Sequence, residues 1–381
     1  MMINNTPIKN SFDNSSSNSL SHKRSINPQK QQGLALISVL LIFAIVSVLA
    51  TAMIERQSLD IQRSGNLQAL QQARAYSSGI EYAVRAGLRL DFDNNAEIDN
   101  LSEDWASPLT YPLDPGTAEI QIIDAQSRFN LNSLHKSASN RAAQNQRFKN
   151  LLAELGIDPI IADNTQQFMD EDSMVDNDYL AEEVPYRASY ALFKHSSELL
   201  LVKEVDADIY RKLKPYISTL PVNATLNVNT ASDKVLASLS STWSLSDADT
   251  VINSRGEKGF NSLEEFWSLA EVQPFTEADK NDPSSNNGSA NQNPKEVWDK
   301  ADFSVNSQYF EVFARVTLAD RIATVEMLMH RDLQSGDMRT YYRDYSRTEA
   351  RLPVVSNANS SANNGVDNSS GNNISGNNNT E

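Results

Sequence analysis

The sequence contains no cysteine among its 381 residues and only four histidines. Without cysteine the chain can form neither disulfides nor thiolate metal sites, so its thiol content does not indicate a compartment. Basic residues are also scarce, because 33 Lys and Arg face 49 Asp and Glu, which gives a net charge of −16. This excess of negative charge opposes binding to nucleic acid or to anionic lipid, since both depend on basic surface.

Recognisable catalytic motifs are missing as well. The sequence has no His-Glu-x-x-His pair, no Gly-x-Ser-x-Gly elbow and no phosphate-binding glycine loop. The histidines are scattered along the chain, at His22, His135, His195 and His330. Carboxylates are plentiful, but a sequence does not show two of them flanking a cleft. We therefore expect a protein that is not an enzyme.

The chain does contain one long uncharged segment, Leu34 to Ile54, after a polar leader of 33 residues. About 20 apolar residues match the hydrocarbon thickness of a bilayer, whereas the apolar core of a secretory signal usually has about 7 to 15. The leader is basic, with four cationic side chains and one acidic one (Lys9, Lys23, Arg24, Lys30; Asp13). By the positive-inside rule the leader is cytoplasmic. The sequence thus predicts a single-pass inner-membrane protein with a soluble domain in the periplasm.

Apolar residues keep a helical spacing beyond the anchor to about Leu90, which predicts one helix roughly 85 Å long. Strand-like alternation occurs at 118–123, 310–316 and 322–329, and the last two segments form a hairpin near Asp320. Seven helical segments are expected between these strands: 142–155, 160–168, 198–205, 209–213, 232–239, 247–253 and 263–269. This order predicts an α+β fold, in which a long N-terminal membrane-anchoring helix packs on a small antiparallel sheet and a large α-helical domain is inserted.

The predicted domain limits follow from this order and from changes in composition. They are a leader (1–33), the transmembrane part of the helix (34–54), the amphipathic helix and first part of the sheet domain (55–134), the inserted helical domain (135–298), the C-terminal strands (299–350) and a disordered tail (351–381). Residues 276–296 are rich in Asn, Ser, Asp and Pro and indicate a loop. The tail consists mainly of Asn, Ser and Gly.

The junction Gln31-Gln32-Gly33-Leu34-Ala35-Leu36 resembles the processing site of type IV pilin-like precursors. The resemblance implies that a prepilin peptidase cuts after Gly33 and methylates the new amino terminus, Leu34. An uncut signal anchor and conventional cleavage at Ala50-Thr51-Ala52 are the alternatives. Most pilin-like subunits carry Glu as mature residue five, where this chain has Ser38. That carboxylate neutralises the amino terminus of the preceding subunit, so its absence suits the first subunit of a filament.

Several short sequence segments extend the resemblance to the K-type minor pseudopilins of the type II secretion system. They are residues 123–132 (IDAQSRFNLN), 152–157 (LAELGI), 168–172 (FMDED), 184–186 (VPY), 197–200 (SELL), 213–216 (LKPY), 220–221 (LP) and 227–231 (NVNTA). The resemblance implies a pilin-type sheet domain that starts and caps the tip of the periplasmic pseudopilus for protein export. Its implied partners are the I- and J-type minor pseudopilins, the major pseudopilin, the prepilin peptidase and the inner-membrane secretion platform.

Four small residues of the anchor, Ala35, Ser38, Ala44 and Ser47, offer positions where partner helices can approach closely. Contact with lipid is the alternative for each. A pilin-like DNA-uptake subunit and a membrane-anchored periplasmic scaffold are the alternative functions of the whole chain.

Eight acidic residues and no basic one lie between Asp163 and Glu183. Hard oxygen ligands favour calcium, but the spacing is not that of an EF-hand, because position six from Asp170 is Val175 and position twelve is Ala181. A solvated acidic loop is the alternative. The K-type resemblance implies calcium in the inserted domain, with Asp170, Asp172, Asp176, Asp178 and Glu182 as candidate ligands.

Residues 221–270 resemble a helix-hairpin-helix unit, a module that often binds DNA. Such a hairpin normally contains a Gly-hydrophobic-Gly turn whose amides meet phosphate, whereas residues 240–245 (SSTWSL) contain no glycine. We therefore expect this unit to pack against protein.

Overall fold

The structure is a computed structural model, and it describes residues 29–114, 116–276, 296–318 and 321–345. The chain forms two compact units, residues 1–68 and residues 69–381. Most of the expected leader, the expected tail and most of the expected loop at 276–296 lie outside the described residues.

One continuous helix, α1 (Gln29–Asn94, 66 residues), confirms the predicted anchor helix and its extension. It already includes Gln29, before the expected start at Leu34, and the Gln and Lys residues at 29–32 favour the helix. Its apolar first part is long enough to cross a membrane, and none of that part is buried against described residues.

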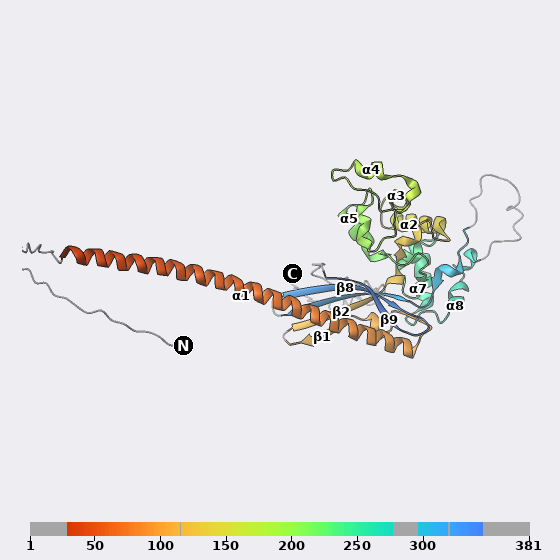
Figure 1. Cartoon of the computed structure of the whole chain (residues 1–381). Coiled ribbons are helices and arrows are strands. Elements are labelled where there is room, and N and C mark those ends of the chain that lie inside the picture. Colours follow the sequence, from red (N-terminus) through yellow and green to blue (C-terminus); the bar gives the residue numbers. More distant parts are fainter. Residues whose placement is uncertain (1–28, 115, 277–295, 319–320, 346–381) are drawn as a thin grey trace, which may run out of the picture. The chain divides into compact units, whose positions relative to one another are not determined.

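The second unit is built on an antiparallel sheet of five strands in the order β1-β2-β7-β8-β9 (Figure 1). The strands are β1 (Leu109–Leu113), β2 (Gly116–Asp124), β7 (Tyr309–Leu318), β8 (Arg321–Arg331) and β9 (Met338–Asp344). The sequence predicted β2, β7 and β8. It also predicted the hairpin formed by β7 and β8, although the turn of this hairpin lies outside the described residues. It missed both edge strands.

The second part of α1 packs on this sheet through Ile80, Val84 and Leu88, which are four residues apart and therefore share one helix face. Each is at most 7% exposed, and burying such a side chain contributes about 1.5–3 kcal/mol. Trp105 packs edge-on against Phe310 in the same core, with the two ring centres 5.3 Å apart. The packed sheet thus confirms the predicted α+β arrangement of helix and sheet.

The inserted helices form two groups with separate cores (Figure 1). The first contains α2 (Arg141–Glu154), α3 (Ile160–Met169), α4 (Asp176–Leu180), η5 (Ser196–Leu201) and α5 (Ala207–Leu213). The second contains α6 (Asp233–Ala237), α7 (Leu245–Arg255), α8 (Leu263–Trp267) and η7 (Gln273–Phe275). All of these elements lie between β2 and β7 in the sequence, so the structure contains the predicted helical insertion.

One expected helix, at residues 198–205, is instead the short 3₁₀ helix η5. Its start is fixed by a capping box between His195 and Glu198, and the chain is already extended at Val202. The extended stretch is needed because the chain must reach Asp206, which caps α5 by accepting from the amide of Ile209 at 2.7 Å.

Short elements connect these parts. They are η1 (Asp104–Ala106), η2 (Ala125–Ser127), η3 (Leu131–Leu134), η4 (Glu171–Ser173), η6 (Lys214–Tyr216), η9 (Lys300–Asp302) and two parallel pairs, β3 (Phe129–Asn130) with β4 (Ile217–Ser218) and β5 (Leu226–Asn227) with β6 (Phe303–Ser304). The pair β5–β6 joins the second helical group to the segment that leads into β7.

Candidate functional site

The residues of the predicted processing site lie within α1. Gly33 and Leu34 are exposed, and a side chain at Gly33 would meet no atom within 4 Å. Ser38 donates its hydroxyl to the carbonyl of Leu34 at 2.9 Å. Its polar group is therefore satisfied within the helix, unlike the carboxylate that most pilin-like subunits carry at this place.

The four small residues of the anchor form two pairs on opposite sides of the helix. Ala35 and Ser38 are neighbours on one face, and Ala44 and Ser47 repeat that spacing nine residues later. At 100° per residue, nine residues correspond to a rotation of about 180°. All four are exposed in α1. The anchor thus presents small residues on two opposite faces.

The acidic side chains predicted to bind calcium do not meet in one place. Asp170 accepts from Arg141 at 2.8 Å, and Lys136 bonds both Glu171 at 2.9 Å and Asp172 at 3.0 Å. Burial raises the pKa of Asp170, but the amide of Asp172, the bond from Arg141 and the charge of Lys136 together lower it below its ordinary value. This part of the segment is neutralised by cations of the same chain.

Further along the segment, Asp176 pairs with Arg187 at 3.2 Å and accepts from the amide of Ala188 at 3.2 Å. Asp178 and Glu182 are exposed. Calcium binding by these residues stays a prediction. In the described part of the chain, three carboxylates whose oxygens all lie within 4.8 Å of one another occur elsewhere, at Asp91, Asp99 and Glu103.

A buried polar network fastens the insertion to the sheet at the end of β2. Asp124 is 2% exposed and accepts from the hydroxyls of Thr230 at 2.5 Å and Ser307 at 2.6 Å. Asn227 donates to the same carboxylate at 3.1 Å and to the carbonyl of Asp99 at 3.2 Å. Two of the short segments that carry the family resemblance, residues 123–132 and 227–231, contact each other in this network. They therefore form the connection between the sheet and the insertion.

Arg331, at the end of β8, lies beside this network and is fully buried. It donates to both carboxylate oxygens of Asp99 at 2.5 Å and to Asp91 at 3.2 Å. Its guanidinium also lies 4.8 Å from the ring centre of Phe310. Glu103 completes the group by accepting from the indole of Trp105 at 2.6 Å. Four carboxylates (Asp91, Asp99, Glu103 and Asp124) therefore share a region that contains one guanidinium.

Burial raises the pKa of each of these four carboxyl groups. The pKa of Glu103 rises to about 7 and those of Asp91 and Asp124 to about 6, and the charge of Asp99 adds to the rise in all three. The pKa of Asp99 is raised by burial, against the effect of Arg331. The network is thus electrostatically strained when every carboxyl is ionised.

The unit that resembles a helix-hairpin-helix uses its polar groups internally. Arg255 donates to the carbonyls of Val228 at 2.9 Å and Ala231 at 2.7 Å, and burial lowers its pKa to about 10. Asn229 accepts from the amide of Phe260 at 2.7 Å. Gly259 has φ +73, and a Cβ there would lie 2.6 Å from the Asn229 side chain, so glycine is required. These contacts favour the predicted role in protein packing.

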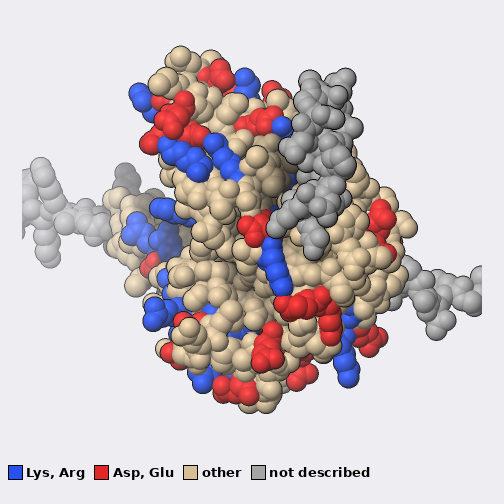
Figure 2. All heavy atoms as spheres, turned by 90° about the vertical axis from the view of Figure 1, so that its right-hand side faces the viewer, with Lys and Arg blue, Asp and Glu red and all other residues tan. Residues whose placement is uncertain are grey.

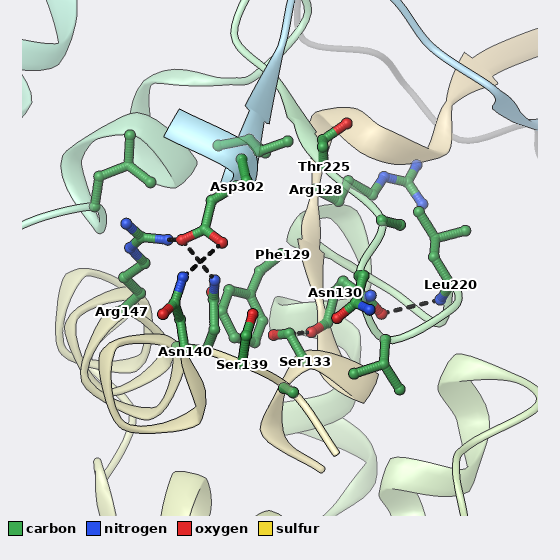
Figure 3. Close-up of a pocket in the computed structure, with 18 of the residues that line it drawn as sticks. Arg128, Phe129, Asn130, Ser133, Ser139, Asn140, Arg147, Leu220, Thr225 and Asp302 are labelled. Atoms are coloured by element: carbon green, nitrogen blue, oxygen red, sulfur yellow. Dashed lines mark hydrogen bonds and ion pairs between the residues drawn. The ribbon is translucent and has the colours of Figure 1, made fainter. Parts of the chain in front are cut away.

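A cavity of about 370 Å³ lies between the two helical groups (Figure 3). On one wall Asp302 accepts from Arg147 at 2.8 Å, Asn140 at 3.2 Å and Gln144 at 3.3 Å. On another wall Arg128 pairs with Glu311 of β7 at 2.7 Å. The charged groups that line the cavity thus serve to hold the two groups and the sheet together.

On the face seen in Figure 2, charge is mixed rather than segregated, and basic side chains occur in short groups next to acidic ones. This face therefore shows no broad basic stripe of the kind on which binding to nucleic acid depends. The net charge of −16 opposes such binding as well.

Comparison with known proteins gives a consistent result. Residues 127–222 and 226–284 match two family models described as type II secretion system, protein K. The type II secretion system protein K of Pseudomonas aeruginosa is 34% identical over 344 residues, which cover 86% of this chain and 96% of that protein. The chain belongs to the type II secretion system protein K family. The protein K of Aeromonas hydrophila is 30% identical over 61% of this chain and 78% of its own length.

A solved structure shows the same fold as this protein K family member. The crystal structure of the GspK-GspI-GspJ complex from enterotoxigenic Escherichia coli contains a chain that is 26% identical, with a TM-score of 0.61. The match covers 75% of this chain and 100% of that chain. The boundary between the two matched family regions, at residues 222–226, falls on the loop that lines the cavity.

Sequence reasoning missed one part of the buried network, namely Asp91, Asp99, Glu103, Ser307 and Arg331. The remaining part, which includes Asp124 and Asn227, lies in the short segments that carry the family resemblance. Asp99 and Arg331 are 232 residues apart, and neither belongs to a spacing pattern that would reveal their contact.

Proposed function

We propose that this protein is a minor pseudopilin that starts and caps the pseudopilus tip of a type II secretion system, together with the I- and J-type subunits. The observation that carries the proposal is the agreement of sequence and fold with protein K, including a relative solved in complex with GspI and GspJ. The inserted helical domain enlarges the head of the subunit, and a bulky head suits a terminal position where no further subunit stacks above it.

In this mechanism the anchor helix associates with helices of the two partner subunits inside the membrane. Small residues let helix backbones approach closely, so that packing and weak hydrogen bonds favour association in lipid. The two opposite pairs of small residues in α1 match a helix with a neighbour on each side: Ala35 with Ser38 contacts one partner, and Ala44 with Ser47 contacts the other.

Processing after Gly33 is part of the same proposal. The prepilin peptidase removes the leader and methylates the amino group of Leu34. A subunit with no predecessor has no amino terminus to neutralise, and an unpaired carboxylate at position 38 would cost several kcal/mol in the helix bundle. Ser38, whose hydroxyl is satisfied by Leu34, avoids this cost.

Calcium in the inserted domain remains a prediction. Three of the five candidate ligands already pair with cations, so a calcium ion would have to displace Lys136, Arg141 or Arg187 from its carboxylates. As they are placed, the residues do not form a coordination sphere, and no step of the proposed mechanism uses the ion.

Processing is tested by the N-terminal residue of the membrane-extracted protein. Mass spectrometry should find methylated Leu34 in the wild type. Gly33→Leu should leave full-length precursor and block secretion, because a bulky side chain then replaces the glycine that precedes the proposed cut. Gly65→Ala is the matched control, since Gly65 lies in the same helix and also has no atom within 4 Å of a built Cβ. A normal mature size in Gly33→Leu would contradict the proposed processing.

Partner contact is tested by purifying the protein from membranes that contain the I- and J-type subunits. Ala44→Leu should reduce recovery of one partner while the other is retained, because the two pairs of small residues face opposite directions. Leu41→Phe adds bulk at about 90° from both faces and should change neither. If Ala44→Leu leaves the recovery of both partners at the wild-type level, the face that contains Ala44 contacts lipid rather than a partner helix.

A further inference from the structure

The buried network at the end of β2 has an imbalance of charge that packing alone does not require. Four carboxylates come from three neighbouring segments: Asp91 from α1, Asp99 and Glu103 from the segment after it, and Asp124 from β2. The cation is Arg331 from β8. Asp104 in η1 adds a further negative charge near Asp91.

The inserted domain contributes neutral groups to the same place. Asn227 donates to Asp124 and to the carbonyl of Asp99, and Thr230 donates to Asp124. From the segment before β7, Ser307 donates its amide to Asp99 at 2.7 Å and its hydroxyl to Asp124. The contacts that hold the insertion on the sheet therefore end on the carboxylates that repel one another.

We propose that these residues, which we call the acidic clasp (Asp91, Asp99, Glu103, Asp124 and Arg331), form a proton-sensitive fastening between the sheet and the inserted domain that tightens when protons bind. The proposal is independent of the secretion role and concerns the fold itself. Neutralising one carboxyl lowers the repulsion within the group, while Arg331 still compensates the charge of Asp99. Asn227 and Ser307 then donate to the carboxyl group of Asp124 in surroundings with less electrostatic repulsion.

The sign of the pH dependence follows from the raised pKa values. A carboxyl whose folded pKa lies above its unfolded value binds more protons in the folded state, so the folded state gains stability as the pH falls through the folded pKa. For Glu103, whose pKa rises from an ordinary value of 4.5 to about 7, this gain begins near pH 8 and builds up until the pH reaches the ordinary value, so that part of it falls between pH 8 and pH 6. For Asp91 and Asp124, with pKa values of about 6, most of the gain comes below pH 6.

Other groups contribute little or oppose the effect in this range. The pKa of Glu81 is lowered to about 2 by Arg343, so its contribution is lost only in stronger acid. Burial lowers the pKa of His330, which destabilises the folded state as the unfolded histidine takes up its proton. A variant of the clasp retains both groups, so it isolates the contribution of the clasp.

The test uses the full chain in detergent with EDTA, so that protons alone vary. Hydrogen exchange, corrected for the intrinsic rate at each pH, reports the opening of residues 226–231 beside the clasp. In the wild type the protection of this segment should rise about threefold to tenfold from pH 8 to pH 6. Helix α2, which lies outside the clasp, should show no comparable rise.

Glu103→Gln removes one charge and keeps an oxygen that can accept from Trp105. This variant should lose most of the pH dependence, and at pH 8 its protection should exceed that of the wild type. Glu183→Gln, at an exposed position, should behave as the wild type. The proposal is overturned if wild-type protection does not rise at pH 6. It is also overturned if Glu103→Gln keeps the wild-type pH dependence. A third contrary result is a loss of protection in Glu103→Gln by the same factor at pH 8 and pH 6, which would mean that Glu103 has only a structural role.

Discussion

Replacing Arg331 by methionine removes the guanidinium that Asp91 and Asp99 share, while filling most of the same volume. Arg331 is fully buried, and Asp99 is 1% exposed in its side chain, so the remaining carboxylate has no access to water. Breaking a buried ion pair by removing one partner costs about 3–5 kcal/mol, because the other charge stays buried without compensation. The cation–π contact with Phe310 is lost as well, at a further cost of about 0.5–2 kcal/mol.

The free energy of unfolding at pH 8 should therefore fall by about 3.5–7 kcal/mol, a large part of the 5–15 kcal/mol that typical domains have. Urea denaturation followed by tryptophan fluorescence measures this change, since Trp105 lies next to the clasp. Arg211→Met removes a cation whose pair with Asp208 is exposed, at 73% and 78%, and should leave the midpoint unchanged.

A double variant sharpens the prediction. Adding Asp99→Asn to Arg331→Met removes the uncompensated charge, so it should restore part of the lost stability at pH 8. A loss below 1 kcal/mol in Arg331→Met, or no recovery in the double variant, would refute the argument that buried charge dominates at this joint.

Three further predictions concern other parts of the molecule. Phe148→Ala should lower the free energy of unfolding by about 3–5 kcal/mol, measured by urea denaturation, because Phe148 is fully buried and stacked on Phe129. Gly259→Ala should lower the melting temperature, since the added Cβ would overlap Asn229; an unchanged value would show that the loop can move. Chelation with EGTA should lower the melting temperature if the acidic segment binds calcium, and an unchanged temperature would identify that segment as a solvated loop.

Much of the fold could be predicted because its signals are local. The apolar spacing of α1 and the alternation in β2, β7 and β8 reflect a single buried face in each element. The edge strands gave no such signal. β1 contains Pro112 and is exposed over its middle residues, while β9 is polar and pairs with β8 across a register shift at Leu328 and Met329.

The joint between sheet and insertion could be predicted only in part. The short segments around Asp124 and Asn227 carry a family resemblance in the sequence, but only the fold shows that they contact each other. Arg331 contacts Asp99 across 232 residues, and such contacts leave no periodic trace in one sequence. Likewise, the density of acidic residues suggested calcium, whereas the cations that neutralise several of them, Lys136, Arg141 and Arg187, all lie outside the segment.

The structure also connects the joint to the proposed role at the tip. A terminal subunit needs its inserted domain held firmly on the sheet that continues from the anchor helix. The clasp and the pair of Arg128 with Glu311 provide that attachment. Loosening either of them should reduce secretion even when processing after Gly33 is normal.

The position of the protein in the filament tests the central claim most directly. Because the chain lacks cysteine, Val184→Cys introduces a single thiol at a position that is 76% exposed, and this thiol can be labelled with gold after the filaments are assembled. The account predicts one label per filament, at one end. Labels distributed along the shafts would contradict it.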